Sequence, residues 1–257
     1  MKLVDSLNRE IHLASVPKRI VSLVPSQTEL LVDLGLEDAI VGITKFCVHP
    51  KNLIKNKKIV GGTKQVHLDK IKALQPDIIL CNKEENTQDI VAACSEISPV
   101  HVSDIETISD CVAVIQQYGA MFQKEAAAKH ISETIQNNLK DFQEYIKDKP
   151  RKKVAYFIWK KPFMVAGKHT FIEYLLKLNN FENVYADLDR YPEIDIANAK
   201  AVDTVFLSSE PYPFKEEHKR EFLAYFPDAR IQLVDGEMFS WYGSRLIKAF
   251  AYFKTLH

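Results

Sequence analysis

The feature that most constrains the fold is a regular rhythm of strands and helices that stops near the middle of the chain. From residue 20 to residue 102, short runs of Val and Ile alternate with stretches whose apolar residues recur at helical spacing. This alternation predicts a parallel sheet covered by helices on both faces. The predicted strands span residues 20–24, 39–43, 78–81 and 100–102. Before them, the segment KLVDSLNREIHL predicts a β-hairpin that turns at residues 5–8.

The rhythm stops at Ser109, where a segment without proline begins and continues to Lys147. Its apolar spacing predicts one broken helix or two consecutive helices. The second helix, KEAAAKHISETIQNNLKDFQEYI, would be about 35 Å long at 1.5 Å per residue. After Pro150 the pattern predicts strands at residues 154–159, 204–208 and 231–234, with helices in TFIEYLLKLNN and KEEHKREFLAYF.

The sequence therefore predicts two α/β lobes with mostly parallel sheets, joined by one long backbone α-helix. We expect the N-terminal lobe at residues 1–122, the connecting helix at 123–149 and the C-terminal lobe at 150–257. A chain of 257 residues is long enough for two modest hydrophobic cores.

Composition excludes several partners. The 34 basic and 34 acidic residues balance, and no basic run is long enough to bind a nucleic-acid backbone or an anionic membrane. No stretch of about 18 apolar residues predicts a membrane span, and the first residues lack the apolar core of a signal peptide. A cytoplasmic location therefore stays open. The four cysteines have no Cys-x-x-Cys spacing, so we expect free, buried thiols.

The turn after the first predicted strand, PSQTE, contains no glycine, which disfavours a phosphate-binding loop or a nucleophile elbow. Ser26 and Glu29 have the spacing of a capping box, which would explain both residues. Gln27 and Thr28 are not explained by capping. They follow a strand in an open parallel sheet, where ligands usually bind, so both are candidate ligand-binding residues.

The other loops that follow predicted strands are rich in aromatic residues. Such residues either pack on the core or form a face for a flat ligand. The candidate ligand-binding residues are Ser26, Gln27, Thr28, Phe46, His49, Asn82, Lys83, Trp159, Phe163, Tyr191, Glu210, Tyr212, Phe239, Trp241 and Tyr242.

Three segments carry a family resemblance: PKRIVSLVPSQTELLVDLGLEDAIVGIT, VGGTKQVHLDKIKALQPDIIL and DGEMFSWYGSRL. In this order they resemble the type III, helical-backbone substrate-binding proteins of ABC importers, which include cobalamin, haem and siderophore receptors. The resemblance implies a monomer at the periplasm or cell surface that holds a metal chelate or a corrinoid, such as cobalamin, in a cleft between its lobes. It implies that Phe46 lies against the ligand.

The resemblance also implies an ABC permease as partner, which an acidic residue on each lobe would contact. Asp69 is the candidate in the first lobe, and Glu216 or Glu217 in the second. It implies no catalytic residue and no intrinsic cofactor.

Alternatives remain open. One alternative keeps the same fold and role but has haem or a ferric siderophore as the ligand. Another is a cytoplasmic enzyme that handles a cofactor, with Glu210 and Asp235 as its candidate acids. A bare metal ion is disfavoured, because such sites take His and carboxylate ligands. Ser26 stands where a His would be expected, and His49 is the one His in a candidate loop.

Overall fold

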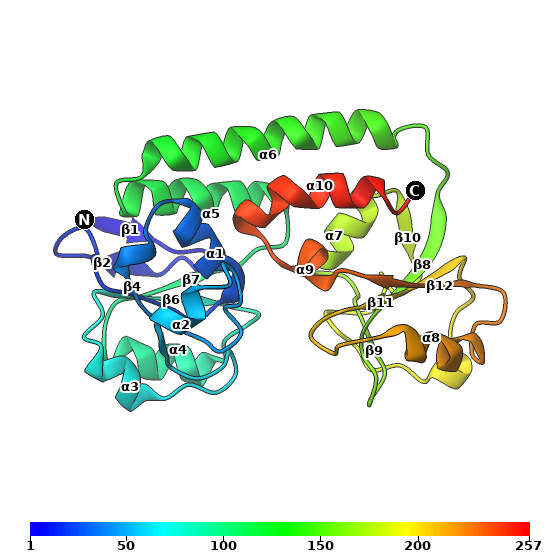
Figure 1. Ribbon diagram of the computed structural model, residues 1–257, viewed down its shortest axis with the longest axis horizontal. Coiled ribbons are helices and arrows are strands. Elements are labelled where there is room, and N and C mark those ends of the chain that lie inside the picture. The colour runs from blue at the N-terminus through cyan, green and yellow to red at the C-terminus, as the bar shows by residue number, and fades with distance from the viewer. The chain divides into compact units, whose positions relative to one another are not determined.

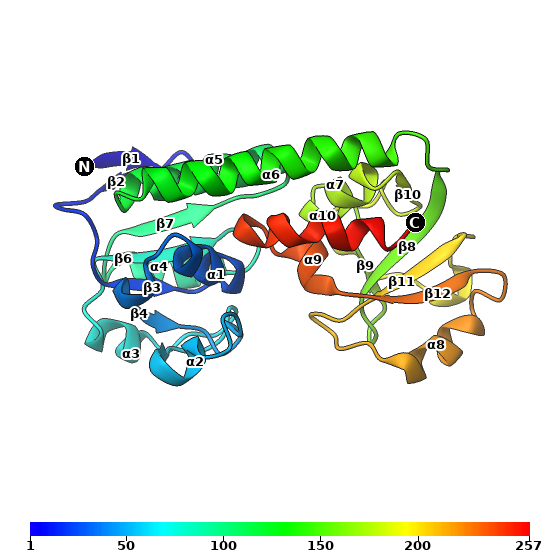
Figure 2. The same cartoon turned by 45° about the horizontal axis from the view of Figure 1, so that its top comes forward.

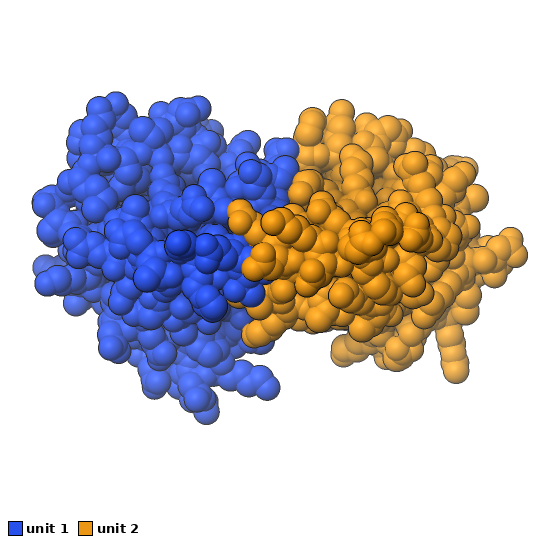
Figure 3. Space-filling model, turned by 90° about the horizontal axis from the view of Figure 1, so that it is seen from above, with its two compact units in different colours: residues 1–135, 242–245 blue, residues 136–241, 246–257 orange.

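The computed structural model describes all 257 residues, which form two compact units (Figures 1 and 3). Unit 1 contains residues 1–135 and 242–245, and unit 2 contains residues 136–241 and 246–257. The predicted fold class is confirmed: each unit is an α/β structure with a mainly parallel sheet, and one long helix, α6 (Glu125–Ile146), runs from one to the other. The exact lobe boundaries given above stay a prediction.

Unit 1 contains a five-stranded parallel sheet in the order β5-β4-β3-β6-β7. Its strands are β3 (Ile20–Ser22), β4 (Ile40–Ile43), β5 (Lys58–Ile59), β6 (Ile78–Asn82) and β7 (Val100–Ser103). Its helices are α1 (Pro25–Asp33), α2 (Leu53–Asn56), α3 (Leu68–Ala73), α4 (Gln88–Ser95) and α5 (Ile108–Met121), with a 3-10 turn, η1, at Glu37–Ala39. The predicted hairpin is confirmed as β1 (Lys2–Val4) and β2 (Glu10–His12).

Unit 2 contains the parallel strands β10-β8-β11-β12, with β9 antiparallel to β8. These strands are β8 (Lys152–Trp159), β9 (Met164–Val165), β10 (Phe181–Asn183), β11 (Thr204–Ser208) and β12 (Arg230–Val234). Its helices are α7 (Phe171–Leu178), α8 (Glu216–Leu223), α9 (Gly236–Ser240) and α10 (Leu246–Lys254), with η2 at Ile196–Asn198.

The central helical segment is two helices. Thr107 and Asp110 form the capping box that starts α5, and Gln123, with φ 54°, breaks the path between α5 and α6. In unit 2, α10 lies beside the second half of α6 (Figures 1 and 2). Phe142 of α6 is fully buried there, with its ring 5.9 Å from those of Phe250 and Phe253.

The capping box predicted for α1 was wrong. The helix begins at Pro25, whose fixed φ suits the first helical position. Its N-cap is therefore Val24, which has no side chain able to accept a hydrogen bond, and Ser26 lies inside the first turn. Glu29 instead accepts a hydrogen bond from Arg245 at 2.8 Å.

This pairing belongs to a short segment, Tyr242–Arg245, that we call the return segment. It is part of unit 1, although the residues on either side of it in the sequence belong to unit 2. The backbone N–H of Gly243 donates to Cys111 Sγ at 3.0 Å, and the left-handed φ of Gly243, 86°, favours glycine. Residues 243–245 form a 3-10 turn, η3.

The four cysteines are free and buried, as expected. Burial raises the pKa of Cys94 to about 11 and that of Cys111 to about 12, so both thiols stay protonated at neutral pH.

His101 of β7 is fully buried, and its Nε2 lies 2.7 Å from Gln117 Oε1. Burial lowers the pKa of His101, so the folded protein holds it neutral, whereas the unfolded chain binds a proton below about pH 6.5. We therefore expect stability that is present above pH 6.5 to be lost as the pH falls below it, by at most about 1.4 kcal/mol per pH unit.

Urea unfolding of the wild type and of His101→Gln, followed by circular dichroism between about pH 7.5 and pH 5.5, checks this expectation. The stability difference between the two proteins should shrink as the pH falls, because carboxylates titrate alike in both. If the free energy of unfolding changed with pH equally in both proteins, His101 would not contribute to the pH dependence.

Candidate functional site

The candidate residues of the turn at α1 lie inside unit 1. Gln27 is fully buried, and its Nε2 lies 3.1 Å from Cys81 O, 2.7 Å from Ser103 Oγ and 2.9 Å from Tyr242 OH. Thr28 is also fully buried and donates to Val24 O at 2.9 Å. A ligand outside the unit cannot touch either side chain in this conformation, so their predicted contact with a ligand gains no support.

Three further candidates, Ser26, Tyr242 and Asn82, are also buried within unit 1. Ser26 and Tyr242 are buried, and burial raises the pKa of the Tyr242 hydroxyl, which stays protonated. Asn82 Oδ1 accepts hydrogen bonds from the backbone N–H groups of Glu84 and Glu85 at 2.9 and 3.1 Å. Asn82 therefore shapes the loop that follows β6.

At the carboxyl end of β4, by contrast, an aromatic ring is exposed. Phe46 is 49% exposed, and a Cβ atom placed on Gly62 would lie only 3.1 Å from its ring. The Nζ atom of Lys45 lies 5.0 Å from the ring centroid. His49, in the same loop, is partly exposed. This end of the sheet offers an apolar ring beside a cation.

Another loop at the same sheet edge follows β6, which is separated from β4 by β3. Its Lys83 is exposed but pairs with Asp104 at 2.5 Å, which neutralises its charge locally. Burial is the main cause that raises the pKa of Glu85 in this loop, and the charge of Glu84 adds to it.

Unit 2 also exposes an aromatic ring at a strand end. Trp159, the last residue of β8, is 37% exposed, and its ring meets Tyr212 edge-on with centroids 5.6 Å apart. Phe163 is partly buried and packs against the hydrophobic core of the unit. Tyr191 is partly exposed. Of these candidates, Trp159 presents the most accessible large apolar surface.

The remaining candidates of unit 2 are Phe239, Glu210 and Trp241, of which Phe239 and Trp241 are buried. Phe239 is fully buried, with its ring 5.2 Å from that of Tyr156. Glu210 Oε1 accepts hydrogen bonds from Trp241 Nε1 at 2.9 Å and from Ser240 Oγ at 2.6 Å. Trp241 is only 6% exposed. The geometry gives these side chains a packing role, and their predicted contact with a ligand stays untested.

The acids proposed for catalysis also have hydrogen-bonding roles in the fold. Asp235 Oδ1 accepts a hydrogen bond from the Glu237 N–H and caps α9. Glu210 holds Trp241, as described. A Cβ atom on Gly236 would lie 2.6 Å from Glu210 Cγ, so glycine is needed for this close approach.

The residues predicted to contact a permease lie on helices and are exposed. Asp69 is in the first turn of α3, and Glu216 and Glu217 are in the first turn of α8. Glu216 pairs with Lys219 at 2.8 Å. Acidic residues in a first helical turn also favour the helix dipole, so position alone does not assign a partner.

Two neighbours of Phe46 are not among the candidate ligand-binding residues. Lys45 directly precedes it, and Gly62 lies beneath its ring from a loop sixteen residues later. From the sequence, Lys45 is one of the loop cations that could face an anionic chelate. Gly62 could not be predicted, because no local pattern shows which backbone a ring will cover.

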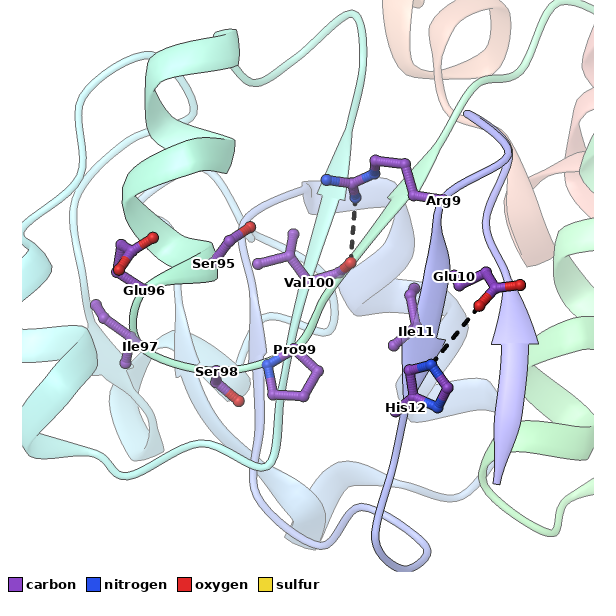
Figure 4. Close-up of a pocket in the computed structure, with 10 residues that line it drawn as sticks. All are labelled: Arg9, Glu10, Ile11, His12, Ser95, Glu96, Ile97, Ser98, Pro99 and Val100. Atoms are coloured by element: carbon purple, nitrogen blue, oxygen red, sulfur yellow. Dashed lines mark hydrogen bonds and ion pairs between the residues drawn. The ribbon is translucent and has the colours of Figure 1, made fainter.

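Two surface grooves lie elsewhere on unit 1. One, with a volume of about 480 Å³, lies between β2 and residues 95–100, which lead into the amino end of β7 (Figure 4). Arg9 crosses it and donates to Val100 O at 3.1 Å. A second groove of about 580 Å³ includes Asp104, Glu106 and Asp110. The first groove begins at the opposite end of β7 from the strand-end loops.

No three or more His, Cys, Asp or Glu side chains are grouped so as to hold a metal ion. None of the helices combines the length and the apolar character needed to cross a membrane.

Comparison with known proteins defines the class. Residues 20–224 match the periplasmic binding protein family, and this chain belongs to that family. The class is one of substrate-binding proteins.

One relative and two solved structures are similar to this chain over most of its length. An uncharacterized ABC transporter substrate-binding lipoprotein, YvrC of Bacillus subtilis (strain 168), is 28% identical over 257 residues, which is 95% of this chain and 81% of the relative. The structure of the periplasmic vitamin B12 binding protein BtuF of Vibrio cholerae has a TM-score of 0.82 at 18% identity, covering 93% of this chain and 96% of that chain. A periplasmic heme binding protein from Pseudomonas aeruginosa has a TM-score of 0.82 at 20% identity, covering 93% and 92%. At these identities the two structures establish a shared fold.

Proposed function

We propose that this protein delivers a metal chelate or a corrinoid of the cobalamin type to an ABC importer. The observation that carries the proposal is the family match over residues 20–224, combined with an exposed aromatic ring at a strand end. Relatives named for vitamin B12 and heme support a large conjugated ligand. Haem or a ferric siderophore is the second candidate ligand, because Lys45 beside Phe46 suits a charged chelate.

We place the protein at the periplasm or the cell surface, as a monomer without an intrinsic cofactor. The lipoprotein named among the relatives supports this location. The alternative, a cytoplasmic enzyme acting on a cofactor, differs in one measurable respect: a binding protein returns its ligand chemically unchanged.

Purification from the native host, followed by mass spectrometry and an absorption spectrum, tests the proposal. A corrinoid, haem or ferric chelate at one equivalent, recovered unchanged after incubation, would support it. A chemically altered ligand would support the enzyme instead, and binding of none of these compounds would contradict the proposed ligand class.

Phe46→Ala is expected to weaken binding of the recovered compound. Aromatic stacking contributes about 0.5–1.5 kcal/mol beyond buried area, so the affinity should fall at least about 2- to 12-fold. Isothermal titration calorimetry measures the change, with Leu223→Ala, an exposed apolar residue of α8, as the control. Equal affinity of Phe46→Ala and the wild type would exclude Phe46 from the ligand site.

We further propose that Asp69 contacts the permease, with Glu216 or Glu217 as the acid of unit 2. Asp69→Lys should slow association with the matching permease by about tenfold at low ionic strength, because rim charges mainly affect the association rate. Asp89→Lys is a matched control, since Asp89 is an exposed acid in the first turn of α4. Equal rates for the two variants would remove Asp69 from the interface.

A further inference from the structure

Phe46 and its two neighbours form a structural element that the family match does not describe. The backbone of Gly62 leaves room for the ring: an added Cβ would lie 3.1 Å from Phe46 Cε2 and 3.6 Å from Lys45 Cε. Gly62 is buried, while Lys45 and Phe46 are both exposed. The aliphatic part of the Lys45 side chain and the Phe46 ring therefore both lie beside the backbone of Gly62.

Backbone conformation does not require glycine at this position. Gly61 has a φ of 127°, and a Cβ there would lie 2.4 Å from Gln65 O. The turn itself therefore requires glycine at position 61. Gly62 has no such φ, and its nearest obstruction is the Phe46 ring. The absence of a side chain at Gly62 therefore leaves the space beside which the Phe46 ring lies.

The charge of Lys45 is uncompensated by any carboxylate. Its Nζ lies 5.0 Å from the Phe46 ring centroid, and it forms no ion pair. Two other lysines of the strand-end loops form ion pairs: Lys83 pairs with Asp104 at 2.5 Å, and Lys160 with Glu221 at 2.5 Å. Lys45 is thus a cation held beside an exposed apolar ring.

We propose that Gly62, Lys45 and Phe46 form a recognition element that selects an anionic ligand, with a carboxylate or phenolate oxygen near Lys45 and an apolar face against Phe46. Lys45 is the specificity-determining residue, and Gly62 is a positioning residue that acts through Phe46. The inference rests on the proposed function and narrows its ligand class to anionic chelates or macrocycles, such as a porphyrin with free carboxylates.

Chemically matched probes test the charge preference. Haemin carries two carboxylates and its dimethyl ester carries none; a ferric tricatecholate is anionic and a ferric trihydroxamate is neutral; cyanocobalamin is a neutral corrinoid. We expect the tightest probe to be anionic, to lose about tenfold in affinity when it is replaced by its neutral counterpart, and to lose a similar factor in Lys45→Met. Lys55→Met, which removes an exposed charge from α2, should leave the affinity unchanged.

The outcomes separate this inference from the proposed function. Tightest binding of a neutral probe, or equal loss of affinity for charged and neutral probes in Lys45→Met, would overturn the inference and leave the proposed function standing. Binding of none of the probes would overturn both.

The role of Gly62 has its own test. Gly62→Ala should weaken binding of the tightest probe about fivefold in the wild-type background and should have no effect in Phe46→Ala, because the glycine acts through the ring. Without any ligand, the fluorine resonance of 4-fluorophenylalanine incorporated at position 46 should shift in Gly62→Ala. An unshifted resonance, or an equal loss of affinity in both backgrounds, would assign Gly62 a structural role alone.

Discussion

Arg245→Met is expected to destabilise unit 1 by about 3–5 kcal/mol, because it leaves a carboxylate buried without its cation. Arg245 Nε donates to Glu29 Oε2 at 2.8 Å, and the two side chains are 5% and 9% exposed. At that burial, water cannot replace the guanidinium. The buried carboxylate of Glu29 keeps its desolvation cost but loses the guanidinium, so the loss far exceeds the effect of breaking a surface ion pair.

Urea unfolding at neutral pH, followed by circular dichroism, measures this loss. Lys248→Met, which removes an exposed cation from the neighbouring helix α10, is the matched control and should change stability by less than about 0.5 kcal/mol. Removing both charges in Glu29→Met with Arg245→Met should recover most of the stability, because apolar side chains of similar volume often replace a buried pair without cost. A loss below about 1 kcal/mol in Arg245→Met alone would mean that water reaches Glu29.

Gln27→Ala is expected to be nearly as damaging, with a loss of about 2–4 kcal/mol. The side chain lies within hydrogen-bonding distance of Cys81 O, Ser103 Oγ and Tyr242 OH, and each polar group left unsatisfied costs about 1–3 kcal/mol. The alanine would also leave a cavity in a fully buried position.

The same urea unfolding measures the Gln27 variant, with the exposed Gln116→Ala on α5 as control. Because the amide and the tyrosine hydroxyl share one network, Gln27→Ala and Tyr242→Phe should be non-additive, with a coupling of about 0.5–3 kcal/mol. Additive losses would show that the two side chains act independently.

The sequence predicted the sheets well because strands buried on both faces leave a strong local signal. The apolar runs of β3, β6 and β11 are buried, and the structure confirms them with at most small changes at their ends. The two-residue strands β5 and β9 and the three-residue strand β10 were missed, since so few residues carry no periodicity. The capping box failed because Pro25 at the first helical position makes Val24 the N-cap, two residues before the predicted Ser26.

The candidate site was harder to predict for a physical reason. Position after a strand predicts that a side chain lies near the sheet edge, but it does not say whether the side chain points outward. Phe46 and Trp159 are exposed, as a ligand face requires, whereas Gln27 and Phe239 are fully buried among partners far away in the sequence. Burial of that kind depends on tertiary contacts that no local pattern contains.

The return segment has a consequence for the order in which the protein can mature during synthesis. Unit 1 has its first 135 residues long before the ribosome reaches Tyr242–Arg245. At about 5–20 residues per second, the delay over the roughly 110 intervening residues is about 5–20 s. Until then Glu29 lacks Arg245, and Gln27 lacks the hydroxyl of Tyr242. The nascent N-terminal part therefore lacks these contacts until residues 242–245 have been made, so completion of its core waits for the synthesis of residues 136–241, which belong to unit 2.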